Sequence, residues 1–589
     1  MYRPQSLSLL FSIVVVSMSM LAQEIGQQGT DPFTGHPANP LAPAAVPTVR
    51  DRVSRAADEE GRLVFRSQSV LVQVPAVVGD KSGNHVHNLT KDVFKVLENG
   101  KPQRIMTFEE VNAGSLRPQV ATPPPGTFSN LALDGKQPFS VTVIALDTIN
   151  TPFLDQFYGR KQLIKYLAGT LDCGHVVGLV VIGSKGVRVL SGLTADPGLL
   201  ITALKKASGE LSPTETFSTD GKVLAASDNQ PSELTGGISP GADPGSKMRE
   251  FVLKADALEG NYQQARATED TLRAFLAMAW SLAGVPGRKS LIWATSSFPF
   301  LLDSPSAAPG GNLSLLYERT VAALNDAQVA VYPVDVRGLV STGPTADATY
   351  SGDLSGPEFG NAAASRSWLQ TSSLTSLEVF AALTGGRAYY NTNDLATSFK
   401  LAADDSSSYY LLGYYLDSAD TKPGWRKLQV QVRGKDWEVR ARTGVLVTNA
   451  TLDPQLTHQA DIDLALISPL DSTGIPVAIQ WQQVVPEGDK RRVEFALRVP
   501  ATSVIDEANQ NRFDVDFIAL ADRKGTPAGK AGQTIKGSIP PAALPKIKAE
   551  GIFYKNALEL PSGDYQVRFV VRDNLSGKIG SVSLPLRVN

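Results

Sequence analysis

Residues 141–151 read Val-Thr-Val-Ile-Ala-Leu-Asp147-Thr-Ile-Asn150-Thr151. The apolar part is continuous, which is typical of a strand covered on both faces of a parallel sheet. The polar cluster Asp147, Asn150 and Thr151 then lies at the carboxyl end of the strand, where open α/β sheets place their ligand sites. Their carboxylate, amide and hydroxyl oxygens suit Mg²⁺ or Ca²⁺. The same residue types also cap helices, so a strand-to-helix turn without a ligand is the alternative interpretation.

The beginning of the chain predicts export. Residues 1–22 have the pattern of a signal peptide, with an apolar run at 7–21 and a small residue, Ala22, suitable for cleavage. The run is short for a membrane-spanning helix, so we expect no membrane span after the signal is removed. The protein is expected to be periplasmic or secreted. Residues 23–61, rich in Pro, Gly, Ala and charged residues, predict a disordered leader.

Composition excludes some classes of partner. The formal net charge is −2, so the chain has no basic field for nucleic acid and no polybasic patch for a membrane surface. Cys173 is the one cysteine, so no intrachain disulfide can form. We interpret this thiol as part of the edge of a sheet core. The fold must therefore be held together by core burial.

The first part of the mature chain predicts a β module followed by a linker. Residues 62–110 contain short strand signals, and Asn99-Gly100 is a hairpin turn signal. Residues 111–138 include Pro123-Pro124-Pro125 and are expected to be a linker.

Residues 139–400 alternate strand and helix signals with short connections. Two stretches rich in polar and turn residues, near 208–262 and 341–366, read as surface insertions. Such alternation predicts a doubly wound, mostly parallel, Rossmann-like sheet with helices on both faces.

The remainder of the chain returns to strand signals. Residues 408–448 predict a β extension that includes an aromatic strand and a hairpin around Gly434. Residues 461–589 show evenly spaced short strands and turns, which predict a C-terminal β-sandwich. The expected fold class is therefore α/β plus all-β, with the doubly wound sheet flanked by the small N-terminal β module and the sandwich.

Several motifs, in order, resemble the VWFA-related proteins of acidobacteria, which are exported proteins with a von Willebrand factor type A domain. The matching segments are Val93–Ile105, Ala145–Thr151, Pro286–Trp293, Tyr332–Leu339, Leu383–Ala388, Tyr409–Tyr414 and Gly563–Asp573. The resemblance covers most of the chain from about residue 62 onward. It implies a type A domain over 139–400.

Type A domains of this kind often bind a divalent ion through a metal-ion-dependent adhesion site with the pattern Asp-x-Ser-x-Ser. Asp147 and Thr151 match its first and last members, but Ile149 replaces the first Ser. Ser296 stands where an Asp would be expected after a later strand, and Asp335 offers a second carboxylate at the same rim. The resemblance therefore implies a degenerate site, with at most weak binding of Mg²⁺ or Ca²⁺.

Enzymatic motifs are scarce. The chain lacks a phosphate-binding Walker loop and a His-Glu-x-x-His pair. His85 and His87 lie two residues apart without a Cys or Glu cluster nearby in sequence, so we interpret them as solvated polar residues. Arg288 and Lys289 are interpreted as charges at the rim of the sheet. Core packing is the interpretation for most of the aromatic residues 409–415.

These observations favour an exported, non-enzymatic binding protein. It would recognise a protein or an envelope polymer at the carboxyl edge of the central sheet, through Asp147, Asn150, Thr151 and Asp335. One alternative is a hydrolase of an envelope polymer that uses Asp147 and Asp335 as paired carboxylates. The other is a purely structural envelope protein.

Overall fold

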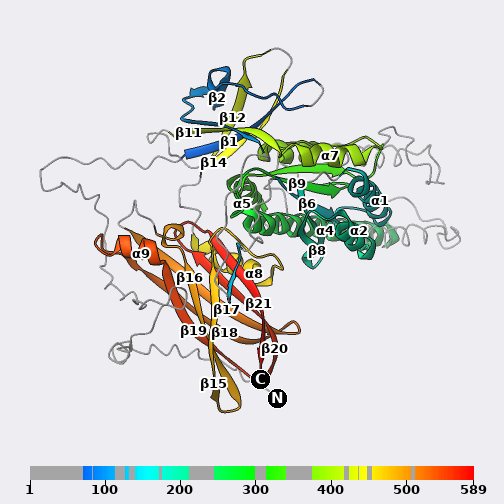
Figure 1. The fold of residues 1–589 in the computed structure, drawn as a ribbon. Helices are drawn as coiled ribbons and strands as arrows, with labels where there is room; N and C mark the ends of the chain where they lie inside the picture. Colours follow the sequence, from blue (N-terminus) through cyan, green and yellow to red (C-terminus); the bar gives the residue numbers. More distant parts are fainter. Residues whose placement is uncertain are drawn as a thin grey trace, which may run out of the picture.

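The computed structural model describes residues 71–81, 84–112, 126–131, 140–170, 175–210, 244–298, 313–339, 374–416, 424–434, 437–447, 454–505 and 511–589. The predicted signal peptide, the leader and the insertion at 341–366 lie outside these residues, as does most of the linker. The described strands form five sheets. Figure 1 shows them as an N-terminal β unit, a sheet with helices on both faces, and a C-terminal pair of sheets.

The central sheet has five strands in the order β10-β9-β6-β7-β8. Their bounds are β6 Ser140–Asp147, β7 His175–Gly183, β8 Gly186–Thr194, β9 Lys289–Thr295 and β10 Val329–Asp335. β10, β9, β6 and β7 are parallel neighbours, whereas β8 pairs antiparallel with β7. Every residue of β9 and β10 is buried, as the continuous apolar runs of these strands predict.

The predicted fold class is wrong. Four of the five sheets among the described residues are antiparallel and the fifth is mixed, so the chain is not built on a doubly wound, mostly parallel sheet. Between β7 and β8 the connection is Ser184 and Lys185 alone. A link this short returns the chain antiparallel, because a parallel neighbour needs a crossover of a dozen or more residues. Among the described residues, two-residue hairpin connections also occur in three of the other four sheets, at Asn99–Gly100, Gly488–Asp489 and Lys524–Gly525.

Helices cover both faces of the mixed sheet (Figure 1). One face carries α1 Phe153–Thr170, α2 Pro197–Lys206 and α7 Leu395–Asp404. The other carries α4 Pro244–Leu282, α5 Leu313–Asp326 and a helix at 374–384. Trp293 of β9 packs edge-on against Phe275 of α4, with ring centroids 4.9 Å apart. The end of the predicted insertion, residues 244–262, thus belongs to a helix that covers the sheet.

The N-terminal β unit combines two segments that are far apart in sequence. One sheet has the order β13-β1-β11-β4 and the other β14-β12-β2-β3. The elements are β1 Leu71–Gly79, η1 Lys91–Val93, β2 Phe94–Glu98, β3 Lys101–Gln103, β4 Thr107–Asn112, β11 Ser408–Tyr415, β12 Gly424–Val432, β13 Glu438–Ala441 and β14 Gly444–Val447. The two sheets share one core, in which Tyr410 and Tyr414 of β11 are fully buried. The predicted β module at 62–110 and the predicted β extension at 408–448 therefore pair with each other and form one unit.

The C-terminal unit consists of two antiparallel sheets that enclose one apolar core, ordered β19-β16-β15-β5 and β18-β17-β20-β21. Its elements are β5 Thr127–Ser129, α8 Pro454–Ile467, β15 Ala478–Glu487, β16 Lys490–Val499, η5 Ala501–Ser503, β17 Arg512–Arg523, β18 Thr526–Ser538, α9 Leu544–Glu550, β19 Ile552–Leu560, β20 Gly563–Asp573 and β21 Ile579–Val588. β5 comes from the predicted linker. No helix among the described residues is long and apolar enough to cross a membrane.

A buried ion triad joins the mixed sheet to the C-terminal unit. Asp461 of α8 accepts from Arg319 of α5 at 2.5 Å and from Arg572 of β20 at 3.0 Å. Asp461 and Arg572 are almost fully buried. Because a buried charge is costly unless it is paired, each member of the triad holds the other two in place.

Candidate functional site

The predicted carboxylates Asp147 and Asp335 both lie at the carboxyl edge of the mixed sheet. Thr295 of β9 stands beside Asp335 of β10 in the parallel register, and Ala294 stands beside Leu146 of β6. Asp147 is therefore level with Thr295 and Asp335. Two strand spacings separate the backbones at Asp147 and Asp335, which is about 10 Å. The two carboxylates share an edge without being neighbours.

The Asp147 carboxylate is fully used by internal donors. One oxygen accepts from the backbone N–H groups of Ile149 and Asn150, both at 2.9 Å. The other accepts from Asn150 Nδ2 at 2.8 Å, Trp293 Nε1 at 2.9 Å and Thr295 Oγ1 at 3.0 Å. The residue is 1% exposed, and this burial raises its pKa although the hydrogen bonds act in the opposite direction.

Asn150 and Thr151 fasten the loop after β6 to its surroundings. Asn150 Nδ2 also donates to Thr271 Oγ1 of α4 at 2.9 Å. The carbonyl oxygen of Asn150 accepts from the hydroxyls of Ser296 and Ser297. Thr151 Oγ1 accepts from the backbone N–H of Ser296 at 3.2 Å. All these side chains are buried except that of Ser297, so the loop is part of the packed interior.

Asp335 is paired with a neighbour on its own loop. Its carboxylate accepts from the backbone N–H of Arg337 at 3.0 Å and from the Arg337 guanidinium at 2.7 to 3.2 Å. Such two-point pairing fixes the orientation of both groups. Asp335 is 1% exposed, so its carboxylate does not face solvent.

This arrangement does not fit a metal-ion-dependent adhesion site. Both oxygens of Asp147 already accept hydrogen bonds from protein groups. Ile149, at the position where the pattern requires a hydroxyl, is a buried apolar residue. The cavity beside Asp147 and Thr151 has a volume of about 30 Å³. That is the space of about one water molecule and far below the ~300 Å³ of a small-molecule pocket. Asp147 and Asn150 form the hydrogen bonds of a strand-end turn, which is the geometry that the alternative interpretation describes.

The surface above this edge is apolar. Phe153, Leu154 and Phe157 of the first two turns of α1 are 43%, 77% and 59% exposed. Leu339, which follows β10, is 62% exposed. Asn393 connects the two segments, because its side-chain oxygen accepts from the backbone N–H of Leu339 and its carbonyl accepts from the Tyr158 hydroxyl of α1. We call Phe153, Leu154, Phe157 and Leu339 the apolar rim.

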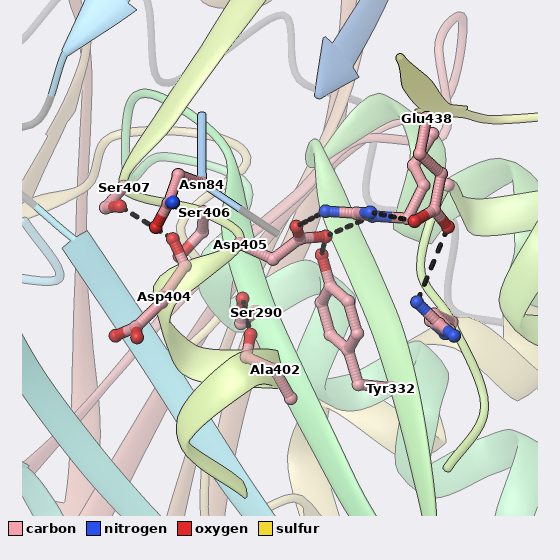
Figure 2. A network of polar contacts seen from close by, with 12 residues as sticks. Asn84, Ser290, Tyr332, Ala402, Asp404, Asp405, Ser406, Ser407 and Glu438 are labelled. Carbon is pink, nitrogen blue, oxygen red and sulfur yellow. Dashed lines mark hydrogen bonds and ion pairs between the residues drawn. The ribbon is translucent and has the colours of Figure 1, made fainter. Parts of the chain in front are cut away.

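Sequence reasoning missed a buried polar network at the opposite edge, where the mixed sheet meets the N-terminal β unit. The Tyr332 hydroxyl of β10 donates to Asp405 at 2.6 Å (Figure 2). The same hydroxyl accepts from Arg288 at 3.0 Å. Asp405 also pairs with Arg440 of β13. Arg288 and Lys289 are 4% and 2% exposed, so their interpretation as rim charges is wrong. The partners of Arg288, the Tyr332 hydroxyl and the carbonyl of Gly385, are distant in sequence, so no local pattern predicts them.

The second group that sequence reasoning missed is a histidine cluster. His85 and His87 lie beside Glu110 of β4, and the donor atoms of the three side chains all lie within 4.8 Å of one another. The sequence signal was the His-x-His spacing, whereas the acidic partner is more than twenty residues away.

No family model and no curated protein matches this chain.

Proposed function

We propose that the chain is an exported, non-enzymatic binding protein that contacts a protein partner with the apolar rim at the carboxyl edge of its mixed sheet. The observation that carries the proposal is the exposure of Phe153, Leu154 and Phe157 on one face of α1. Contiguous exposed apolar side chains mark interaction sites on soluble proteins. Aromatic side chains are also enriched among the residues that dominate binding energy.

The polar residues below the rim support this proposal in a different role from the one predicted. Asp147 and Asn150 tie the loop that precedes α1 to β9 and α4. A rim built on such a loop keeps its shape before the partner arrives, and a preformed surface loses less entropy on binding. In this proposal Asp147, Asn150, Thr151 and Asp335 position the contact surface, and no metal ion takes part. The resemblance to VWFA-related proteins stays part of the proposal, as does export through the predicted signal at 1–22.

The alternative hydrolase has less support. A pair of catalytic carboxylates needs one group that can give up a proton and one that stays ionised next to the substrate. Asp147 accepts five hydrogen bonds from protein groups, and Asp335 is bound by Arg337. Neither oxygen pair is directed at a shared cavity of substrate size among the described residues.

A capture experiment tests the proposal. The full chain is immobilised and exposed to envelope extract, with and without chelator, beside the double variant Leu154→Ser and Phe157→Ser. The matched control is Leu199→Ser, because Leu199 is 58% exposed on α2 and lies near the opposite edge of the sheet. We expect one partner to be retained equally with and without chelator, and its affinity to fall at least about tenfold in the double variant.

The control should retain the partner at the wild-type level. Retention that the double variant does not change, or that chelator abolishes, would contradict binding through the apolar rim. Turnover of an envelope polymer by the wild-type chain would favour the hydrolase instead.

A further inference from the structure

Three metal-ligating side chains meet in the N-terminal β unit, far from the apolar rim. His85 and His87 follow β1, and Gly79 and His85 form an antiparallel bridge. Glu110 lies on β4, directly opposite Tyr410 of β11. Because β1 and β4 flank β11, the two histidines and the carboxylate approach each other from both sides of the same central strand.

His85 has the features of an unused ligand. Its side chain is 10% exposed, and neither ring nitrogen has a hydrogen-bond partner among the described residues. The ring stacks on Tyr410 with centroids 5.3 Å apart and meets the His87 ring edge-on at 4.6 Å. Buried polar atoms are almost always paired in folded proteins, so two unpaired nitrogens at one position call for a partner that the described residues do not supply.

The distances suit a small divalent ion. His87 Nδ1 lies 2.8 Å from Glu110 Oε1, and His85 Nε2 lies 3.7 Å from the same oxygen. A tetrahedral ion with bonds of about 2.0–2.1 Å separates its ligand atoms by about 3.4 Å. Small rotations of the His87 and Glu110 side chains therefore convert the cluster into three ligands of one ion.

We propose that His85, His87 and Glu110 bind one divalent transition-metal ion of the Zn²⁺ class. Two imidazoles and one carboxylate favour Zn²⁺ and its neighbours over Mg²⁺ and Ca²⁺, which prefer oxygen ligands alone. When the ion binds through His87 Nδ1, the proton on that nitrogen passes to solvent while Nε2 takes one up, so the ring stays neutral and its Nδ1 lone pair bonds to the metal. The ion would tie the segment after β1 to β4 across β11, and a fourth position stays open for water.

The entry path is open, because the His87 side chain is 52% exposed. The ion therefore does not need to be trapped during folding, and it can be added to and removed from the folded chain. This makes the proposal testable on one preparation of the full protein, made without a histidine tag.

The test is titration of the chelator-treated full chain with Zn²⁺ by calorimetry, and with Co²⁺ by visible absorption. We expect one ion per chain and the intense absorption of four-coordinate Co²⁺. His87→Ala and Glu110→Gln should each weaken Zn²⁺ binding by more than about 100-fold, since even the loss of a group that only orients a ligand costs about 10–100-fold. His458→Ala is the matched control, because His458 also pairs with a carboxylate, that of Asp516, but has no second histidine beside it in the described part of the chain.

Circular dichroism of each variant shows whether the fold is kept. We expect both variants to fold, because His87 is exposed and Gln has the same shape as Glu110. Absence of Zn²⁺ binding by the wild type at micromolar concentration would overturn the proposal. Binding that stays unchanged in His87→Ala and Glu110→Gln, or that His458→Ala abolishes, would also overturn it.

Discussion

Lys289 offers a direct measure of what burial of a charge costs this fold. It is the first residue of β9 and is 2% exposed, and its ammonium donates to the carbonyl of Val285. Burial lowers its pKa from 10.5 to about 7. Each pKa unit corresponds to 1.36 kcal/mol, so holding the charged form inside costs about 5 kcal/mol of stability at low pH. We predict that Lys289→Met stabilises the protein.

The sign of the pH dependence follows from proton counting. Between pH 7 and 10.5 the unfolded chain keeps a proton on Lys289 that the folded chain has released, so the stability of the wild type rises with pH across this window. Lys289→Met lacks this titration and also loses one hydrogen bond, worth about 1 kcal/mol. Its advantage should therefore be about 4 kcal/mol at pH 6 and shrink to about 1 kcal/mol at pH 9.

The assay is urea unfolding of wild type and variant at both pH values. Lys205→Met, on the exposed face of α2, is the control and should change stability little at either pH. A destabilising effect of Lys289→Met, or an effect that is the same at pH 6 and pH 9, would refute the cost of about 5 kcal/mol for the buried ammonium.

Three further outcomes are expected. The melting temperature should be the same in millimolar Mg²⁺ as in chelator. With an intact site, Mg²⁺ at 100 times its Kd would add about 2.7 kcal/mol to the free energy of unfolding. A gain in stability with Mg²⁺ that Asp147→Ala removes would contradict this prediction. Asp147→Asn should cost about 2–4 kcal/mol in urea unfolding, because an amide turns donors toward the donors of Asn150, Trp293 and Thr295; an effect below 1 kcal/mol would refute that reasoning. Tyr332→Phe should cost about 1–3 kcal/mol, since the hydroxyl lies between two buried charges, and an unchanged melting temperature would show that the network is not stabilising.

Local pattern predicted the central strand well. Residues 141–147 were expected to be a buried strand, and β6 spans Ser140–Asp147. The direction of the edge strand β8 was harder to predict, because the turn at Gly183–Gly186 makes β8 antiparallel to β7, and strand signals alone do not show this. β18 was missed, since its sequence is rich in Gly and polar residues and none of its residues is buried. An edge strand of this kind is defined by its neighbour β17 and carries no hydrophobic alternation of its own.

The candidate site shows the same limit. Sequence placed Asp147 at a strand end, but whether its oxygens face a ligand or the protein depends on Trp293, Thr295 and the loop backbone. Trp293 and Thr295 come from another strand, more than 140 residues away. The histidine cluster depends in the same way on Glu110, which a strand pairing brings to His85 and His87. Long-range register, which no local window contains, decides both sites.

The pairing of β1 and β4 with β11 has a consequence for how the chain folds. Leu89 and Tyr410 are hydrogen-bonded although they lie 321 residues apart, so the first strands cannot complete their sheet until a much later segment has been synthesised. The mixed sheet lies between them in sequence. Ser290 near the start of β9 stands beside Thr142 near the start of β6, and its hydroxyl donates to the carbonyl of Ala402 near the end of α7. Both ends of the intervening unit thus reach the same edge. Once that unit has folded, it brings the two halves of the N-terminal sheets together and shortens the loop that they must close. A chain that stops before Ser408 would leave β1 and β4 as two unpaired edges, which are the surfaces that promote aggregation.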